Sequence, residues 1–273
     1  MKAIWWIRRD LRLNDNLTLQ KALSNSQILP VFILDPILLS GTNTRRLSFL
    51  FNNLAQFDND LRIRGSYLVL RNGSPVDELE KLLAETGAEQ IVAEEDFTPY
   101  DRLRSVLVGS RIPLKTVQGQ LGLHPLANLK ANGKPYQVFT SFKKNWLALL
   151  PDLSSYPAPA HIPTIPDISS DPIPEGDPED LFPPGETAAW IRLADFLSTK
   201  SIQYSSYRDR MDLEGTSLLS PYFHFGILGL RTAIFKILQV IRQTGDAGEG
   251  QSAETWLNEL IWREFYIHIL YHY

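Results

Sequence analysis

The sequence predicts an α/β unit with a doubly wound, parallel five-stranded sheet, followed by a unit that is all-α. Three observations carry this prediction. Short β-rich runs alternate with amphipathic stretches over the first half of the chain, a Pro-rich stretch interrupts it after residue 150, and only helical patterns follow. Strand–helix alternation is typical of a parallel sheet with helices on both faces, and its crossovers should be right-handed.

Five β-rich runs supply the expected strands, which cover residues 2–7, 28–34, 67–70, 90–93 and 114–117. The expected helices between them cover residues 16–24, 44–64, 76–86 and 100–107. The second of these helices carries a 3.6-residue stripe of apolar side chains between Leu47 and Leu61. No Gly-rich dinucleotide fingerprint and no Walker phosphate loop follows any strand. A nucleotide-like ligand would therefore bind by other means at the carboxyl ends of the strands.

The Pro-rich stretch predicts a boundary between domains. Residues 151–184 hold ten of the 18 prolines, together with many acidic residues. Proline removes a backbone donor and disfavours helix before it, and long irregular loops are uncommon inside one compact domain. We therefore expect an α/β domain over 1–150 and a connector over 151–185. A helical domain should follow over 186–273, with helices at residues 187–199, 229–244 and 252–273.

Composition narrows the function classes. The chain has no cysteine, which excludes disulfides and thiolate metal sites, and we expect no metal site. We find no signal peptide and no apolar run of membrane-spanning length, so we expect a cytoplasmic location and no membrane partner.

The charge is divided unevenly between the two halves of the chain. Residues 1–150 hold 19 Lys/Arg and 14 Asp/Glu, a balance of +5, whereas residues 151–273 hold 8 Lys/Arg and 17 Asp/Glu, a balance of −9. The acidic second half is an objection to a nucleic-acid partner.

The loop after the first strand, within WWIRRDLRLNDNLTL, is dense in charge. Its polar side chains are Arg8, Arg9, Asp10, Arg12, Asn14 and Asp15. We favour a structural interpretation, in which these groups form ion pairs at the surface and between domains, because charge clusters are usually structural. The alternative is a loop that faces a ligand at the carboxyl end of a strand.

The letters GTSLLSP at residues 215–221 predict the start of a helix, with hydroxyl caps and a proline in the first turn. Free backbone N–H groups and hydroxyls at such a place bind anions such as a diphosphate. Simple capping is the alternative. Because Tyr204 and Arg208 lie upstream, we weigh an anion-binding site and simple capping equally.

The chain ends in ELIWREFYIHILYHY, and six of its last 18 residues are aromatic. On a helix, Trp256, Glu259 and Trp262 lie near one face, with Arg263 beside them. A tryptophan face can stack on a base, and a carboxylate beside it can accept from a pyrimidine ring N–H. A buried Glu–Trp–Arg combination is hard to explain by packing alone, because buried charges need partners. Core packing is the interpretation we favour for Leu260, Ile261 and Phe265.

Four sequence blocks, in order, carry a resemblance to a known family: WWIRRDLRLNDN, GKPYQVFTSFKKNW, EGTSLLSPYFHFGILGLR and WLNELIWREFY. The chain resembles the photolyase/cryptochrome flavoproteins, most closely a bacterial cyclobutane pyrimidine dimer photolyase. The resemblance implies an antenna-bearing α/β domain, a long connector and part of a helical FAD-binding domain. It also implies light-driven repair of pyrimidine dimers in damaged DNA, by electron transfer from reduced FAD.

The resemblance assigns roles by position. The residues it implies for FAD are Tyr204, Thr216, Ser217, Leu218, Leu219, Ser220, Trp256 and Arg263. Those implied for the flipped DNA lesion are Glu259, Trp262, Arg263 and Tyr266. It assigns no catalytic residue within the chain.

Two departures from the family limit the prediction. Tyr100 and Asp101 stand where folate-using members carry an Asn–Glu pair, which argues against a folate antenna and leaves a deazaflavin, a flavin or no antenna open. The family also runs on beyond residue 273. We therefore expect a truncated form, a fragment or one half of a split protein, whose last helix has lost its packing partners and would associate with a missing C-terminal half. The alternatives are a cryptochrome-type photoreceptor without repair activity and an inactive remnant.

Overall fold

The computed structural model describes residues 1–151, 153, 155–178 and 180–273, and its first half is built on the expected parallel sheet. The order of the strands is β3-β2-β1-β4-β5, and every pairing is parallel. The strands are β1 Lys2–Ile7, β2 Gln27–Leu34, β3 Val69–Asn72, β4 Gln90–Glu94 and β5 Leu114–Val117. The prediction of five parallel strands is confirmed, with the third strand starting two residues later than expected.

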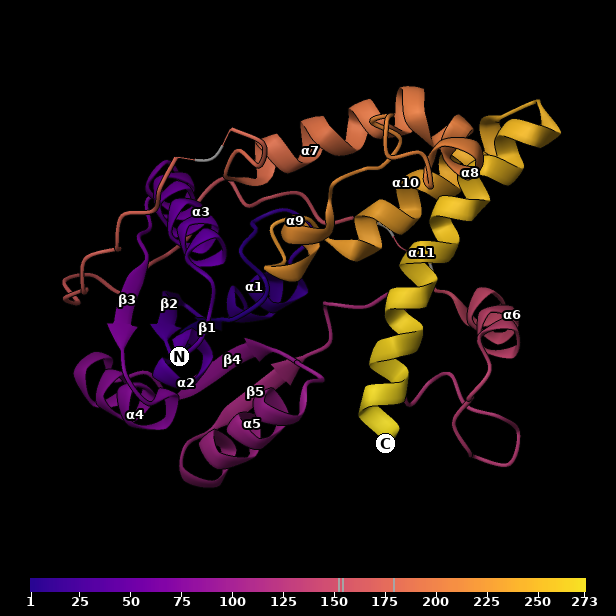
Figure 1. The fold of residues 1–273 in the computed structure, drawn as a ribbon. Helices are drawn as coiled ribbons and strands as arrows, with labels where there is room; N and C mark the ends of the chain where they lie inside the picture. The colour runs from indigo at the N-terminus through magenta and orange to yellow at the C-terminus, as the bar shows by residue number, and fades with distance from the viewer. Residues whose placement is uncertain (152, 154, 179) are drawn as a thin grey trace.

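Helices cover both faces of the sheet, as Figure 1 shows. Alternate residues of β1 enter two cores, Trp5 with Leu54 of α3 on one face and Trp6 with Leu79 of α4 on the other. The flanking helices are α1 Leu17–Ala22, α2 Pro36–Leu39, α3 Thr44–Arg62, α4 Pro75–Thr86 and α5 Pro99–Arg111. Several begin at a side-chain cap, such as Thr98, whose hydroxyl accepts from Asp101 N. The doubly wound arrangement is therefore confirmed.

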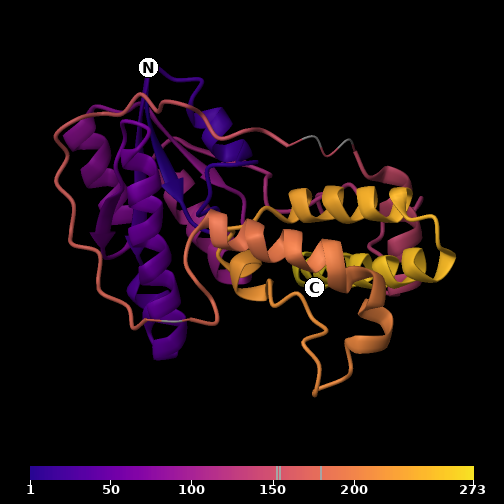
Figure 2. The ribbon, with the colours of Figure 1, turned by 90° about the horizontal axis from the view of Figure 1, so that it is seen from above.

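The stretch between the two units follows the outer edge of the sheet layer, as Figure 2 shows. Ile165 N donates to Ile28 O at 3.0 Å, and Ile162 N donates to Arg64 O at 3.0 Å. Both isoleucines are buried. The described part of the connector is thus held on the α/β unit by backbone hydrogen bonds and apolar contacts.

The second half is helical among the residues described. Its helices are α7 Glu186–Asp195, α8 Tyr204–Tyr207, α9 Ser220–His224, α10 Leu230–Gln243 and α11 Ala247–His272. The expected helix at 187–199 is α7 followed by a π-helical turn, Phe196–Lys200. The helix expected at 252–273 starts at Ala247, because the Asp246 side chain caps it by accepting from Glu249 N. Gly248 and Gly250 weaken the helical pattern in that first turn.

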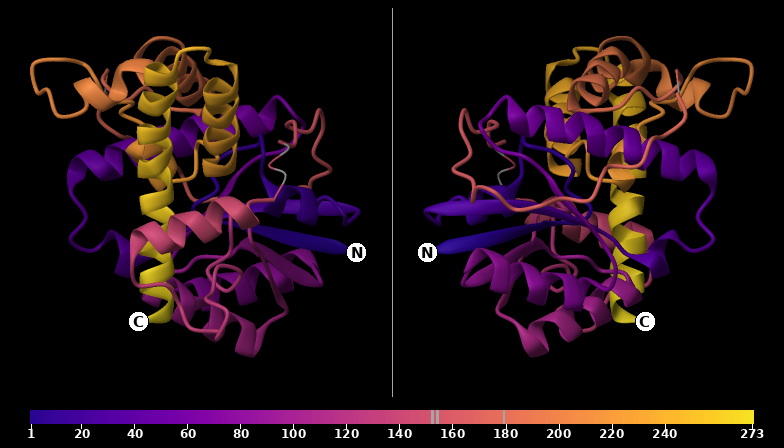
Figure 3. Two further views of the ribbon diagram at one scale, coloured as in Figure 1. Left: turned by 90° about the vertical axis from the view of Figure 1, so that its right-hand side faces the viewer. Right: turned by 90° about the vertical axis from the view of Figure 1, so that its left-hand side faces the viewer.

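The last helix does not end without packing partners, which corrects our expectation. A helix that the sequence patterns did not predict, α6 Phe139–Leu149, lies beside the C-terminal half of α11 (Figure 3). Phe142 of α6 packs against Phe265 and His268, with ring centroids 5.1 Å apart in each pair. The residues 121–149 of the first half therefore cover much of the aromatic helix. None of the described helices is long and apolar enough to cross a bilayer.

Candidate functional site

The charged loop after β1 ties the sheet to the helices. Arg12, which is 2% exposed, donates to Gly226 O at 3.0 Å and lies 3.4 Å from Glu94. Asp15 accepts from the Thr232 hydroxyl at 2.8 Å. These contacts join the two halves of the chain, so the structural interpretation is confirmed for Arg12 and Asp15.

Buried carboxylates complete this junction. Burial raises the pKa of Glu94 to about 8, although Arg12 acts in the opposite direction. Glu186, the first residue of α7, accepts from the Asn14 backbone N–H at 3.1 Å and from the Asn14 side-chain amide at 2.8 Å. It also accepts from Leu13 N, and burial raises its pKa. Three amide donors of the loop after β1 therefore hold the start of α7 to the sheet unit.

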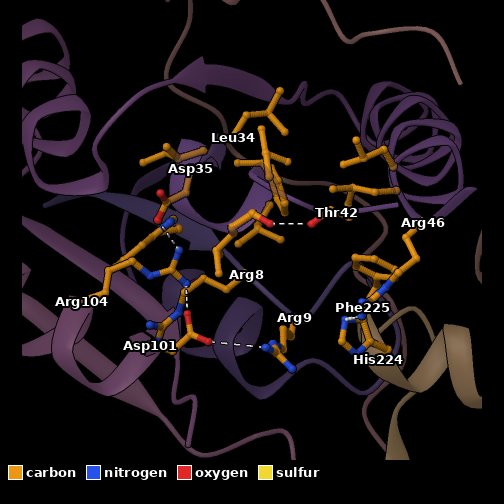
Figure 4. A pocket seen from close by; sticks show the side chains of 18 residues that line it. Arg8, Arg9, Leu34, Asp35, Thr42, Arg46, Asp101, Arg104, His224 and Phe225 are labelled. Atoms are coloured by element: carbon orange, nitrogen blue, oxygen red, sulfur yellow. Dashed lines mark hydrogen bonds and ion pairs between the residues drawn. The ribbon is translucent and has the colours of Figure 1, made fainter. Parts of the chain in front are cut away.

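A cavity of about 240 Å³ opens at the carboxyl ends of β1 and β2 (Figure 4). Its polar lining comes from Arg8, Arg9, Asp35, Thr42, Arg46, Asp101, Arg104 and His224. Its apolar lining comes from Trp6, Ile7, Phe32, Ile33, Leu34, Leu38, Leu39, Leu47, Leu50 and Phe225. In open α/β sheets, ligands bind at this edge. We call this cavity the sheet-edge cavity.

The arginines of the sheet-edge cavity are held in place by aromatic and acidic groups. Arg8 and Arg104 lie over the Trp6 ring, 4.8 Å and 5.1 Å from its centroid. Arg104 pairs with Asp101 and, at 3.4 Å, with Asp35. The Nε atoms of Arg8 and Arg104 are buried without a hydrogen-bond partner in the described part of the chain. The wall of the cavity therefore carries cationic side chains whose Nε atoms are buried and unpaired.

His224 closes the opposite side of the sheet-edge cavity. Burial, with Arg9 and Arg46 nearby, lowers the pKa of His224 to about 4. The imidazole is therefore neutral at neutral pH, and its Nε2 accepts from Arg46 Nη2 at 3.1 Å. Sequence reasoning missed Asp35 and His224 as lining residues. The position of Asp35 directly after β2 was the available signal for it.

Part of the predicted site on α11 is assembled. Trp256 is 3% exposed and packs on Phe196, with ring centroids 4.8 Å apart. Tyr204 packs edge-on against the same Phe196 ring, at 5.8 Å. The half-exposed Glu259 forms an ion pair with Arg208, one turn of helix after Tyr204. Tyr204, Trp256 and Glu259 therefore lie together.

Trp262 and Tyr266 form a separate aromatic group. Phe139 stacks face to face on Trp262, with centroids 3.7 Å apart and planes 6° apart. Tyr266 stacks on Trp262 at 5.5 Å and 27°, and it is 64% exposed. One face of Trp262 is therefore covered by the first half of the chain.

Arg263 lies apart from both groups. Burial lowers its pKa, and its charged surroundings include Arg9, Glu94 and Asp96 of the sheet unit. Its Nη1 atom is buried without a hydrogen-bond partner among the residues described. Arg263 thus faces the carboxyl ends of β1 and β4.

The loop before α9 departs from the expected capping. Pro221 is in the first turn as predicted, but no side chain caps the helix. The backbone N–H groups of 215–219 and the hydroxyls of Thr216, Ser217 and Ser220 make no hydrogen bond within the described chain. Leu218 adopts a φ of +51°, which is uncommon for a residue other than glycine. This arrangement leaves a cluster of donors facing no protein partner.

That loop is connected to the α11 aromatics through Phe196. Thr216, Ser217 and Leu218 line a cavity of about 450 Å³ together with Phe196. Phe196 also contacts Trp256 and Tyr204, so it links the two predicted groups. Leu219 is buried, and Ser220 lines a neighbouring cavity with Arg46 and His224. No cluster of three metal-binding side chains occurs among the described residues.

Comparisons with known proteins agree with this architecture. Residues 3–164 match the family model described as DNA photolyase. A deoxyribodipyrimidine photo-lyase from Thermus thermophilus is 35% identical, and the match covers 98% of this chain and 60% of the relative. The chain resembles an archaeal photolyase from Sulfolobus tokodaii, solved with two FAD molecules, with a TM-score of 0.76 and 25% identity. That match covers 99% of this chain and 60% of the archaeal one.

A relative of similar size also matches. An uncharacterized 31.6 kDa protein encoded in the atpI 5′ region of Synechococcus sp. strain PCC 6716 is 32% identical, over 96% of this chain and 98% of the relative. By contrast, the chain spans about 60% of the length of the Thermus photo-lyase. Because the DNA photolyase model matches residues 3–164, more than half of this chain, the chain belongs to the DNA photolyase family.

Proposed function

We propose that this chain forms the FAD-binding and lesion-binding wall of an enzyme that repairs cyclobutane pyrimidine dimers in DNA with light. The observation that carries the proposal is the loop 215–220, rich in unpaired donors, whose residues 216–218 share a cavity with Phe196. Tyr204 and Trp256 pack on that Phe196 ring. Membership of the DNA photolyase family supports it.

The residues of the loop fit the diphosphate of FAD. Unpaired N–H groups and hydroxyls of 215–220 are the donors that phosphate oxygens accept from. Phe196, which lines the same cavity and packs on Trp256, provides an apolar contact beside them. When bound, the reduced flavin would supply the electron that splits the dimer after light absorption.

Glu259 and Trp262 fit the needs of an extruded pyrimidine pair. A dimer stacks poorly and is cheap to extrude from the duplex. Tyr266, which is exposed and itself stacked on Trp262, can stack on a base, and such stacking contributes about 1–3 kcal/mol in other single-strand sites. Glu259 is half-exposed and can exchange its Arg208 partner for a pyrimidine N–H.

Binding of damaged DNA tests this role of Glu259. The variant Glu259→Gln should lose most of the preference for an oligonucleotide with one thymine dimer over the same undamaged oligonucleotide, about a tenfold effect for one charged hydrogen bond. The control is Glu254→Gln on the exposed side of the same helix. If wild type and Glu259→Gln preferred the damaged oligonucleotide equally, Glu259 would not be part of the lesion site.

Repair is measured as loss of the dimer under blue light, with FAD and a reductant present and a dark control. We expect loss of the dimer in the light only. A chain that binds both FAD and the dimer but leaves the dimer intact in the light would contradict the enzymatic proposal and favour a light-sensing role.

We also propose that the sheet-edge cavity takes a second, planar chromophore of the flavin or deazaflavin type. The support is the place of the cavity at the carboxyl ends of β1 and β2, its mixture of apolar and cationic lining residues, and the second FAD of the archaeal structure. Leu38→Trp, at the mouth of the cavity, should reduce FAD stoichiometry from two to one if the second chromophore is FAD. Ile37→Trp, on its exposed neighbour outside the lining, is the control. Two equivalents retained by Leu38→Trp would contradict this placement.

A further inference from the structure

The two edges of the five-stranded sheet differ in how the chain covers them. β3 forms one edge, and the connector pairs with it: Leu70 O accepts from Asp171 N at 3.0 Å, and Leu70 N donates to the Ser170 hydroxyl at 2.9 Å. Asn72 N donates to the Asp171 carboxylate at 3.0 Å. β5 forms the opposite edge, as Figure 1 shows. The chain thus satisfies one sheet edge with a non-helical segment that carries an acidic side chain.

The backbone of β5 is open on the side away from β4. Glu95 N donates to Val117 O at 2.8 Å, and the two strands are parallel. Alternate residues of a strand direct their backbone groups to the same neighbour, so Leu114 and Thr116 direct theirs away from β4. In the described part of the chain, neither residue makes a hydrogen bond on that side. Lys115 and Thr116 are exposed, so this edge presents unpaired donors and acceptors to solvent.

Two lysines stand beside the open edge on one face of the sheet. Val117 packs against the core that contains Leu19 of α1, so Lys115, two residues earlier on the strand, points to the same face. Contact with the Lys21 side chain of α1, together with the repulsion of its charge, lowers the pKa of Lys115. Neither lysine forms an ion pair with a carboxylate of the described residues. An anionic group beside the edge would relieve this repulsion.

The other face of the edge is apolar. Leu114 packs against the core that contains Val108 of α5. A Cβ at Gly109 would lie 3.9 Å from the Leu114 Cβ, and Val106, one turn earlier on α5, is 68% exposed. A strand added to this edge would place successive side chains on opposite faces. Alternate residues would therefore meet the two lysines, and the residues between them would meet the aliphatic side of α5.

We propose that the outer edge of β5 binds an extended segment of a partner protein in which acidic and aliphatic residues alternate. Its main chain would pair with Leu114 and Thr116, and its acidic side chains would contact Lys21 and Lys115. Strand addition to a sheet edge takes affinity from main-chain hydrogen bonds and specificity from alternate side chains. Pairing two β5 edges would bring two such lysine pairs together, and like charges across strands are destabilising. Charge therefore favours an acidic partner over a second copy of this chain.

The test titrates the 273-residue chain into a fluorescein-labelled, capped peptide of alternating glutamate and valine residues, without FAD, light or DNA. We expect saturable binding that weakens as salt is added, because the charged contacts are exposed. A matched peptide of alternating lysine and valine should not bind. The double variant Lys21→Glu/Lys115→Glu should bind the glutamate peptide at least tenfold more weakly. The control Lys134→Glu/Lys144→Glu makes the same change in net charge at exposed positions before and within α6, and it should stay within twofold of wild type.

Thr116→Pro tests the backbone pairing separately from the charge. Proline is tolerated at an edge position whose N–H faces solvent, but it removes that donor. The variant should keep a urea midpoint close to that of wild type and bind the glutamate peptide at least fivefold more weakly, with the same dependence on salt. Amide hydrogen exchange of wild type gives a second measure that needs no variant. Saturating peptide should slow exchange at Leu114 and Thr116.

Several results would overturn the proposal. They are equal binding of the two peptides, equal weakening by the two lysine pairs, and unchanged exchange at Thr116 in saturating peptide. Wild type that binds neither peptide up to about 1 mM would mean that Lys115 only keeps the edge unpaired. Self-association of wild type that Thr116→Pro abolishes would assign the edge to a second copy of this chain. Because no arm contains FAD or damaged DNA, failure of the proposed repair function leaves this result interpretable.

Discussion

At the scale of single residues, Glu264 shows how packing decides the role of a side chain within a motif. It lies in the same helical block as Glu259, but it is 2% exposed and accepts from Gly122 N at 2.5 Å and Trp146 Nε1 at 2.6 Å. Sequence reasoning selected Glu259 and passed over Glu264, because the donors that hold Glu264 are more than 100 residues away in the chain.

Glu264 should make the stability of the fold depend on pH. Burial raises its pKa from 4.5 to about 7, so its contribution is fully present below pH 4.5 and is lost as the pH rises through 7. Because a tenfold change in proton affinity corresponds to about 1.36 kcal/mol, the loss is roughly 3 kcal/mol. Glu264→Gln, which cannot ionise, should lose about 2 kcal/mol less stability than wild type between pH 5.0 and pH 7.5, measured by urea unfolding, because that window covers most of the titration.

The matched control for Glu264 is Glu254→Gln, an exposed position on the same helix, which should keep the wild-type pH dependence. A wild-type-like pH dependence in Glu264→Gln would show that Glu264 is not the titrating group.

At the scale of elements, α6 secures α11 to the sheet unit. Three contacts join the two helices. Phe139 of α6 stacks on Trp262 of α11, and Phe142 packs against Phe265. Trp146 donates its indole N–H to Glu264. The strands were predictable because runs buried on both faces carry a strong local signal. The bounds of α6 were not predicted, and its contact with α11 is a tertiary one that no local pattern contains.

Truncating the central contact of α6 should be costly. Phe142→Ala should lower the free energy of unfolding by about 3–5 kcal/mol, because it leaves a cavity against Phe265 and His268. Leu147→Ala, on the exposed side of the same helix, should change it by less than about 0.5 kcal/mol. Urea midpoints measure both, and similar costs for the two variants would contradict the packing role of α6.

At the scale of the whole molecule, a buried polar junction joins the sheet to the helices. Gly226 has a φ of +67°, and a Cβ there would lie 1.6 Å from Arg9 O, so the two halves meet backbone to backbone. The sequence indicated that the loop after β1 is structural, but not which groups it meets. Those partners follow only from the arrangement of the two units.

Arg12 should therefore control the cooperativity of unfolding. Arg12→Met leaves the buried Gly226 O and Asp15 O without their donor and removes the cation beside Glu94, and it should cost about 3–5 kcal/mol. We expect one unfolding transition in wild type and separate transitions for sheet and helices in the variant, observed by intrinsic fluorescence and circular dichroism. Arg62→Met, which removes only the surface pair with Asp58, should cost less than about 0.5 kcal/mol and keep one transition.

The central claim, that FAD is held by the loop 215–220 beside Trp256, is tested most directly by titrating the purified chain with FAD. We predict saturable binding that Thr216→Val/Ser217→Ala weakens by at least tenfold, because two hydrogen bonds to phosphate are lost. Ser198→Ala/Thr199→Val, whose hydroxyls bond Asp195 O in the neighbouring π-helical turn, should bind like wild type. Absence of FAD binding, or equal affinity in all three proteins, would contradict the account.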